Sequence, residues 1–211
     1  EYSRQAMVAP IEVSVTPGPG GKVVISEGEY TSEGFETEGL NPLKRYPAAI
    51  ASHYTGPAPA RQSYPHMYYS GPYMQPSYIG GHNVADPYND SINVNLVVNN
   101  TDGSILGYKY FNFDNLSGAV GKVNLVLDMI PKGLDGTITV YTAAPWKGKP
   151  KAVGSFKLKR DMQPVATKLR ADVSAVKGLK GKHPLYLVFS SPTKEKSMCD
   201  ITHLQFEVTE Q

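Results

Sequence analysis

The chain has little of what most catalytic and redox sites are built from. Its 211 residues include a single cysteine, Cys199, which rules out an internal disulfide and a paired-cysteine metal or redox site. No apolar run approaches the roughly 18 residues of a membrane helix, so we expect no membrane span. The N-terminus also lacks a basic-then-apolar signal segment. A net charge of +2 is too small to indicate a nucleic-acid partner.

The motifs of common enzyme classes are absent too. The sequence holds no nucleophile elbow, zinc-protease histidine pair, phosphate-binding loop or dinucleotide-binding glycine pattern. Its five histidines stand apart, so we predict no catalytic and no metal-ligating residues. One enzymatic hypothesis remains, a lyase that abstracts a proton from its substrate. It is based on His66, Tyr68 and Tyr69 together with a surplus of lysine. Asp86 and Asp90 fit either a calcium loop or ordinary turns.

Alternation of period two dominates from residue 91 onward. Turn signals such as Pro131-Lys132-Gly133 separate the alternating runs, and no window of about 12 residues has a helical period. Short strands between regular turns predict an all-β fold, a jelly-roll β-sandwich from about residue 48 to 208. Thr202, Leu204, Phe206 and Val208 are expected to share one side of the last strand. The predicted core consists of Val123, Leu125, Leu127, Ile138, Val140, Leu185, Leu187, Phe189, Leu204 and Phe206.

Residues 1–47 predict a short N-terminal extension, the exit from an upstream domain. Two alternating runs, 11–15 and 22–25, flank a segment rich in Pro and Gly, which predicts a hairpin or strand pair. Residues 48–90 have no sustained period but are rich in Tyr and Pro. Because each aromatic side chain gains by burying about 150–250 Å², we expect a long ordered insert there. The predicted sandwich domain is 48–211.

Basic residues are concentrated between positions 147 and 182, which hold eleven Lys/Arg against two Asp. This pattern is typical of lysines that protect sheet edges, and it also fits attraction to an acidic partner such as a uronic-acid polysaccharide. The single tryptophan, Trp146, lies in a turn between two predicted strands. A tryptophan there either caps the end of a sandwich or offers a ring on which the apolar face of a sugar stacks.

Several stretches resemble carbohydrate-binding module family 6. They are 103–113, 136–140 and 183–189, then 199–206 in the place of the family's closing strand and 49–54 in the place of its opening strand. The resemblance covers about residues 48–208. The longer pattern, with a Pro/Tyr-rich insert before 99–104, is similar to modules at the C-terminus of bacterial family 43 glycoside hydrolases. Those enzymes remove arabinose or xylose units from plant polysaccharides.

The chain departs from the family at its site residues. Ile50 and Ser52 stand where the family has two glutamates that usually hold a structural calcium, and Thr202 stands where it has an aspartate. Calcium prefers several hard oxygens, so the resemblance implies that this site is lost and that no cofactor is bound. Ile105 replaces one stacking aromatic of the family's main sugar cleft, and residues 162–164 replace the motif of the other.

These observations lead to three hypotheses. The first is a non-catalytic accessory module of a secreted glycan-degrading enzyme, an arabinofuranosidase or xylosidase of family 43. It binds neutral or acidic plant-type polysaccharide through loop aromatics. Its expected contacts are Trp146, Tyr108, His203 and Asp200, the last aligned with the polar residue of the family's cleft.

The second hypothesis is a structural module that packs on a catalytic domain without binding sugar. The third is the polysaccharide lyase acting on an acidic glycan. We expect a monomer that is secreted, periplasmic or at the cell surface.

Overall fold

The structure, a computed structural model, describes residue 9 and residues 11–34, 37–57, 71–77 and 94–210. Within these residues the regular elements are strands and short 3-10 helices, as the period-two pattern predicts. The 3-10 helices are η1 (Ala48–Ile50), η3 (Phe113–Leu116) and η4 (Ser174–Gly178). The strands are β1 (Val13–Val15), β2 (Val23–Ile25), β3 (Tyr46–Pro47), β4 (His53–Thr55), β5 (Tyr73–Ser77), β6 (Val94–Val98), β7 (Ile105–Asn112), β8 (Lys122–Pro131), β9 (Gly136–Tyr141), β10 (Gly154–Leu158), β11 (Thr167–Asp172), β12 (Lys182–Ser190) and β13 (Cys199–Thr209).

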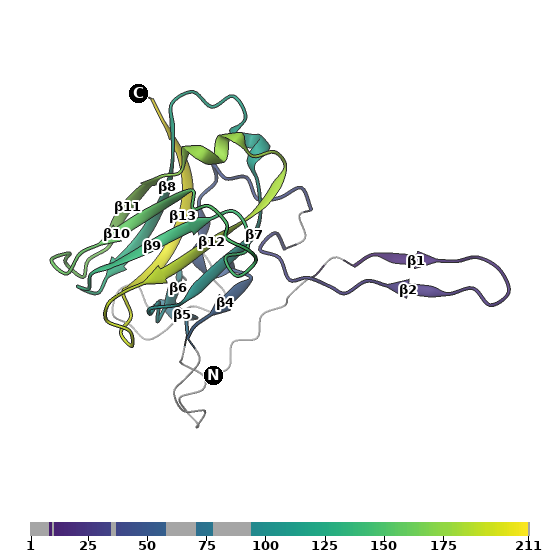
Figure 1. Cartoon of the computed structure of the whole chain (residues 1–211), viewed down its shortest axis with the longest axis horizontal. Coiled ribbons are helices and arrows are strands. Elements are labelled where there is room, and N and C mark those ends of the chain that lie inside the picture. The colour runs from purple at the N-terminus through teal and green to yellow at the C-terminus, as the bar shows by residue number, and fades with distance from the viewer. Residues whose placement is uncertain (1–8, 10, 35–36, 58–70, 78–93, 211) are drawn as a thin grey trace, which may run out of the picture.

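Two antiparallel sheets make the body of the molecule (Figure 1). One sheet has the order β10-β9-β12-β7-β4, and the other has the order β11-β8-β13-β6-β5, with β3 also paired to β13. Strands far apart in sequence are therefore neighbours, as in β13 beside β8 and β12 beside β7. The all-β sandwich predicted from the sequence is confirmed.

The core fills the space between the two sheets. All ten residues of the predicted core are buried, because in β8, β9 and β12 every second side chain points inward. Phe111, Phe113 and Phe206 meet there edge to face or tilted, with Phe206 5.4 and 5.5 Å from the other two ring centroids. Such aromatic contacts add to the hydrophobic gain of burial.

One detail of the last strand differs from the sequence prediction. The register of β13 against β8 shifts between Ile201 and His203, so Thr202 is an extra residue that breaks the alternation. Ile201 is consequently the buried residue, whereas Thr202 is half-buried and Val208 is exposed at the end of the strand. The prediction that Thr202 shares a side with Leu204 and Phe206 is wrong for this reason, whereas Val208, paired with Val123, does lie on their side.

The N-terminal extension has two parts. β1 and β2 pair as an antiparallel hairpin that projects away from the sandwich, as Figure 1 shows, and confirm the predicted strand pair. The chain then returns along the part of β7 that β4 does not cover, where the Leu40 amide donates to the Tyr110 carbonyl and the Leu40 carbonyl accepts from the Asn112 amide. Leu40 is buried in the core cluster, and Tyr46 packs against it. Residues on both sides of the predicted boundary at 47/48 thus contribute to the sandwich.

Candidate functional site

An aromatic cluster lies on the outer face of the five-stranded sheet. Trp146, in the loop between β9 and β10, keeps 51% of its surface exposed. Its ring stacks on the imidazole of His53 from β4, with centroids 4.8 Å apart and an interplanar angle of 19°. It also meets the ring of Tyr186 from β12 edge to face at 5.2 Å. Because the sheet order is β9-β12-β7-β4, the loop reaches across two strands to bring Trp146 to His53. We call Trp146, His53 and Tyr186 the aromatic platform.

The platform depends on a glycine beneath it. Gly107 of β7 is paired with His53 on one side and with Tyr186 on the other. A Cβ at this position would lie 2.6 Å from Cε1 of Tyr186 and 2.9 Å from Cβ of His53. Glycine therefore leaves the space over β7 that the flanking side chains occupy.

Charged and polar groups border the platform. Lys109 of β7 donates from Nζ to Oε1 of Glu29 at 2.5 Å, and the Tyr110 hydroxyl donates to Oε2 of the same carboxylate at 2.8 Å. The hydrogen bond from Lys109 is the main reason why the pKa of Glu29 is lowered, and Lys147, next to Trp146 in the chain, lowers it further. Glu29 is thus an ionised acceptor near the aromatic platform.

The histidine and the two tyrosines of this face are neutral near pH 7. Burial, with a smaller effect of Lys109, lowers the pKa of His53. Burial first, and then the hydrogen bond to Glu29, raise the pKa of Tyr110 to about 12. Burial likewise raises the pKa of Tyr186. With an ionised carboxylate and two protonated phenols, the face is suited to hydrogen bonding and ring stacking.

Tyr108, a predicted sugar contact, lies in the core. Its side chain has no exposed surface, and its hydroxyl makes no hydrogen bond within the described part of the chain. On β7 it points to the opposite face from Gly107, since side chains alternate along a strand. A residue without exposed surface cannot contact a glycan in this structure, so the assignment of Tyr108 as a binding residue is corrected.

Asp200 is also largely buried. Its Oδ2 lies 2.5 Å from Nζ of Lys132, and Asp200 pairs with Ile130 across β13 and β8. The neighbouring Cys199 is completely buried, and burial raises the pKa of its thiol well above the ordinary range. This end of β13 therefore holds an ion pair and an inert thiol.

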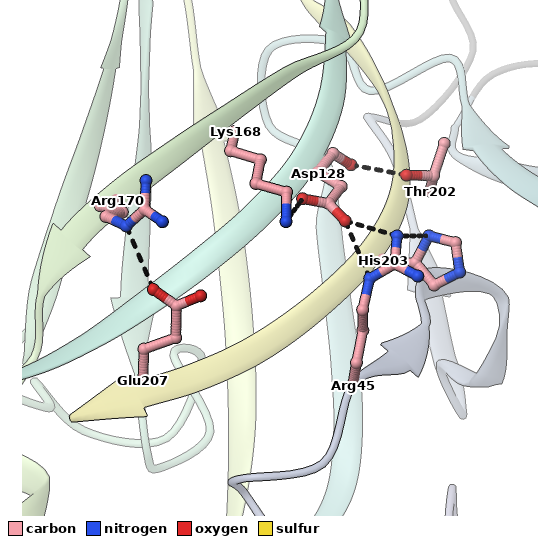
Figure 2. A network of polar contacts seen from close by, with 7 residues as sticks. All are labelled: Arg45, Asp128, Lys168, Arg170, Thr202, His203 and Glu207. Carbon is pink, nitrogen blue, oxygen red and sulfur yellow. Dashed lines mark hydrogen bonds and ion pairs between the residues drawn. The ribbon is translucent and has the colours of Figure 1, made fainter.

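His203 lies on the outer face of the other sheet, away from the aromatic platform. Figure 2 shows it in a polar network that crosses three strands. Lys168 of β11, Asp128 of β8 and His203 of β13 form one cross-strand row, and Arg45 lies over Asp128 and His203. The structure thus separates His203 from Trp146, and the four predicted contacts do not form one site.

The residues at the family's calcium positions do not suit a divalent cation. Ile50 offers no side-chain oxygen and packs against the core. The Ser52 hydroxyl is buried without a hydrogen-bond partner among the described residues, and the Thr202 hydroxyl donates to the Asp128 carbonyl at 3.1 Å. Within the described ranges, no group of three or more His, Cys, Asp or Glu side chains could hold a metal ion.

The cleft positions of the resemblance are aliphatic or exposed. Ile105 opens β7 and is half-buried, Met162 packs partly against the core, and Gln163 and Pro164 are exposed. None of these four residues is aromatic. The residues of the lyase hypothesis, His66, Tyr68 and Tyr69, and the candidate calcium residues Asp86 and Asp90 lie outside the described residues.

Sequence reasoning missed the partners of Trp146. Tyr186 falls on the outward side of its predicted strand, and an outward aromatic was the available signal. His53 gave no such signal, because its contact with Trp146 depends on the strand order of the folded sheet. No helix among the described residues is long and apolar enough to cross a membrane.

The sequence matches no protein-family model and no curated protein. Solved structures do match the fold. A family 43 arabinoxylan arabinofuranohydrolase from Bacillus subtilis, solved in complex with cellotetraose, is 19% identical with a TM-score of 0.56, and the match covers 92% of this chain. The chain spans 33% of the length of that enzyme.

Isolated carbohydrate-binding modules match over nearly their whole length. A β-1,3-glucan-binding family 6 module from Bacillus halodurans is 13% identical with a TM-score of 0.53, covering 80% of this chain and 98% of the module. A family 6 module from Clostridium stercorarium, in complex with cellobiose, is 14% identical with a TM-score of 0.51. The match covers 80% of this chain and 96% of the module. The chain therefore has the β-sandwich fold of family 6 carbohydrate-binding modules, as the sequence resemblance predicts.

Proposed function

We propose that this chain is a non-catalytic accessory module that binds plant-type polysaccharide through the exposed ring of Trp146, which His53 and the buried Tyr186 support in the aromatic platform. The observation that carries the proposal is the half-exposed Trp146, held by ring contacts on the outer face of a sandwich of this fold. The similar modules are described with β-1,3-glucan and cellobiose. Fold alone does not fix function, so the proposal rests on the platform.

The chemistry of the platform supports sugar recognition. The C–H face of a pyranose is apolar and stacks on a flat ring, while its hydroxyls need acceptors and donors at the rim. Trp146 provides the ring, and Glu29 and Lys109 provide an ionised acceptor and a cationic donor nearby. His53 holds the Trp146 ring from beneath, which limits the ordering cost of binding.

The setting of the module is also part of the proposal. The match to the Bacillus subtilis enzyme supports association with a family 43 glycoside hydrolase, and hence a secreted, periplasmic or cell-surface location. In this setting the module holds the enzyme on its polymeric substrate.

Affinity electrophoresis tests the proposal. The unmutated protein and Trp146→Ala are run through native gels that contain xylan, arabinan or pectin. A ring that covers about 100 Å² of sugar contributes roughly 2.5 kcal/mol at about 25 cal/mol per Å². Loss of the ring therefore weakens binding on the order of tenfold to a hundredfold. The control is Val120→Ala, which truncates an exposed apolar side chain elsewhere.

We expect xylan or arabinan to retard the unmutated protein and the Val120→Ala control, and Trp146→Ala to migrate freely through the same neutral glycan with its fold intact. If no polysaccharide retards the unmutated protein, the purely structural module is the better account. Release of unsaturated products, followed by ultraviolet absorbance, would instead indicate the lyase.

A further inference from the structure

A small pocket opens on the outer face of the six-stranded sheet, on the opposite side of the sandwich from the aromatic platform. It encloses about 230 Å³. This is less than the roughly 300–1,000 Å³ of sites for drug-sized ligands, and it suits a group the size of one sugar ring. Its lining combines charged groups with an apolar wall and includes Arg45, Asp128, Ile130, Ala166, Lys168 and Thr202.

The charges of the pocket leave one cation in surplus. Asp128 Oδ2 accepts from Arg45 Nη2 at 2.6 Å and from Arg45 Nε at 3.0 Å. Lys168 approaches the other oxygen only to 3.9 Å, too far for a hydrogen bond, and its side chain is 58% exposed. The single carboxylate of Asp128 thus faces two cations. Because Asp128 is hydrogen-bonded to Arg45, the ammonium group of Lys168 is left without a hydrogen-bonded carboxylate among the residues of the pocket.

Arg45 is held in a fixed direction. Besides Asp128 it contacts Nδ1 of His203, at 2.9 Å from Nη2 (Figure 2). A guanidinium can only donate, so Nδ1 of His203 accepts and the imidazole is neutral. Of the guanidinium nitrogens, Nη1 makes no hydrogen bond to another described residue. The site therefore offers two cationic donors, Arg45 Nη1 and Lys168 Nζ.

A neighbouring ion pair does not cancel this surplus. Arg170 of β11 pairs with Glu207 of β13 at 3.1 Å, so those two charges offset each other. The five charged residues of Figure 2 are Arg45, Lys168 and Arg170 against Asp128 and Glu207, which gives a net charge of 3 − 2 = +1. Lys168 and Arg170 also belong to the basic stretch of residues 147–182.

We propose that this pocket is a second glycan site that takes the carboxylate of a uronic acid residue in an acidic polysaccharide. The carboxylate binds Lys168 Nζ and Arg45 Nη1 by charged hydrogen bonds, the strong class of such bonds. The ring lies against Ile130 and Ala166, and Asp128 accepts a sugar hydroxyl. This site is separate from the aromatic platform and does not depend on Trp146.

Calorimetric titration with trigalacturonate and with its methyl ester tests the site. The ester keeps the sugar rings but removes the negative charges. The variants are Lys168→Met, which keeps an unbranched apolar side chain but removes the charged amine, and Lys180→Met as the matched control. Lys180 is an exposed lysine of the same basic stretch that contacts Ser117, before the start of β8, whereas the pocket lies near the end of β8.

We expect trigalacturonate to bind the unmutated protein, Lys180→Met and Trp146→Ala alike, and to bind Lys168→Met about tenfold more weakly, which is the lower end for a charged hydrogen bond. The methyl ester should bind about tenfold more weakly than the acid, and salt should weaken the binding of the acid.

Unchanged affinity in Lys168→Met, equal binding of acid and ester, or loss of acid binding in Trp146→Ala would each overturn the second site. So would an unmutated protein that does not bind trigalacturonate. Failure of the aromatic platform would appear separately, as retention of Trp146→Ala on neutral glycans.

Discussion

Gly107 and Tyr186 pair across β7 and β12, and a Cβ on Gly107 would lie 2.6 Å from Cε1 of the Tyr186 ring. The Tyr186 ring therefore occupies the space that a side chain at position 107 would need. This relationship connects the backbone of β7 to the position of the aromatic platform, because Tyr186 is in contact with both His53 and Trp146. The consequence for binding can be tested directly.

Gly107→Ala should destabilise the fold and weaken polysaccharide retention together. The added methyl group overlaps Tyr186 and His53, and overpacking of this kind costs about 1–3 kcal/mol. Gly178→Ala is the matched control, since a Cβ there meets nothing within 4 Å and its backbone has no positive φ. Thermal melts and affinity gels measure both effects. Retention and stability equal to those of the control would show that the platform does not need the space over β7.

Tyr108→Phe should leave glycan binding unchanged and raise the melting temperature. The Tyr108 hydroxyl is buried without a partner among the described residues, and such a group costs about 1–3 kcal/mol. Tyr54→Phe is the opposite case, because the Tyr54 hydroxyl donates to the Ala49 carbonyl at 2.9 Å. Melting of the two variants side by side separates the cases. An equal loss of stability in both would mean that the Tyr108 hydroxyl is hydrogen-bonded after all.

His203 should make stability depend on pH. Burial first, and then Arg45, hold the pKa of His203 below its ordinary value of 6.5 in the folded state, despite the opposing effect of Asp128. The unfolded chain then binds a proton at higher pH than the folded chain, so the free energy of unfolding falls as the pH drops from about 6.5 through the lowered pKa. His53 contributes in the same direction.

His203→Asn keeps an acceptor near the position of Nδ1 but cannot take up the proton. We expect its melting temperature to fall less than that of the unmutated protein between about pH 7.5 and about pH 5, while a smaller dependence from His53 remains. The readout is the difference in melting temperature between the two pH values. The same difference in both proteins would show that His203 does not contribute to the pH dependence of stability.

Calcium should not stabilise this protein. Ile50, Ser52 and Thr202 offer too few oxygens at the positions where the family holds the ion, and a ligand that binds only the folded state would add about 2.7 kcal/mol at one hundred times its Kd. We expect equal melting temperatures in millimolar calcium and in chelator. A rise of several degrees with calcium would point to other oxygens, with Asp86 and Asp90 the first to replace.

The sandwich could be predicted from the sequence because its strands alternate. Leu185, Leu187 and Phe189 are separated by outward-facing residues, and a shift of one residue would expose all three. The position of a bulge cannot be predicted from alternation alone. The extra residue Thr202 is defined by how β13 pairs with β8, a strand that is distant in the sequence. The orientation of the last strand before His203 was therefore assigned to the wrong side.

The candidate sites could be predicted only in part. Trp146 was found because a single tryptophan in a turn is conspicuous in the sequence. Its contact with His53 and the contact of Arg45 with Asp128 join residues that are distant along the chain, so only the strand order brings them together. Tyr108 was misassigned because its stretch carries aromatics on both faces of β7, and composition alone does not say which face is buried.

The central claim, that Trp146 binds the sugar, is tested most directly by the fluorescence of Trp146 itself. It is the only tryptophan in the chain, so tryptophan emission reports on this one ring. In a titration with xylo- and cello-oligosaccharides, we predict a saturable change in emission whose midpoint equals the calorimetric Kd of the same sugar. Calorimetric binding of these sugars without any change in tryptophan emission would contradict the account.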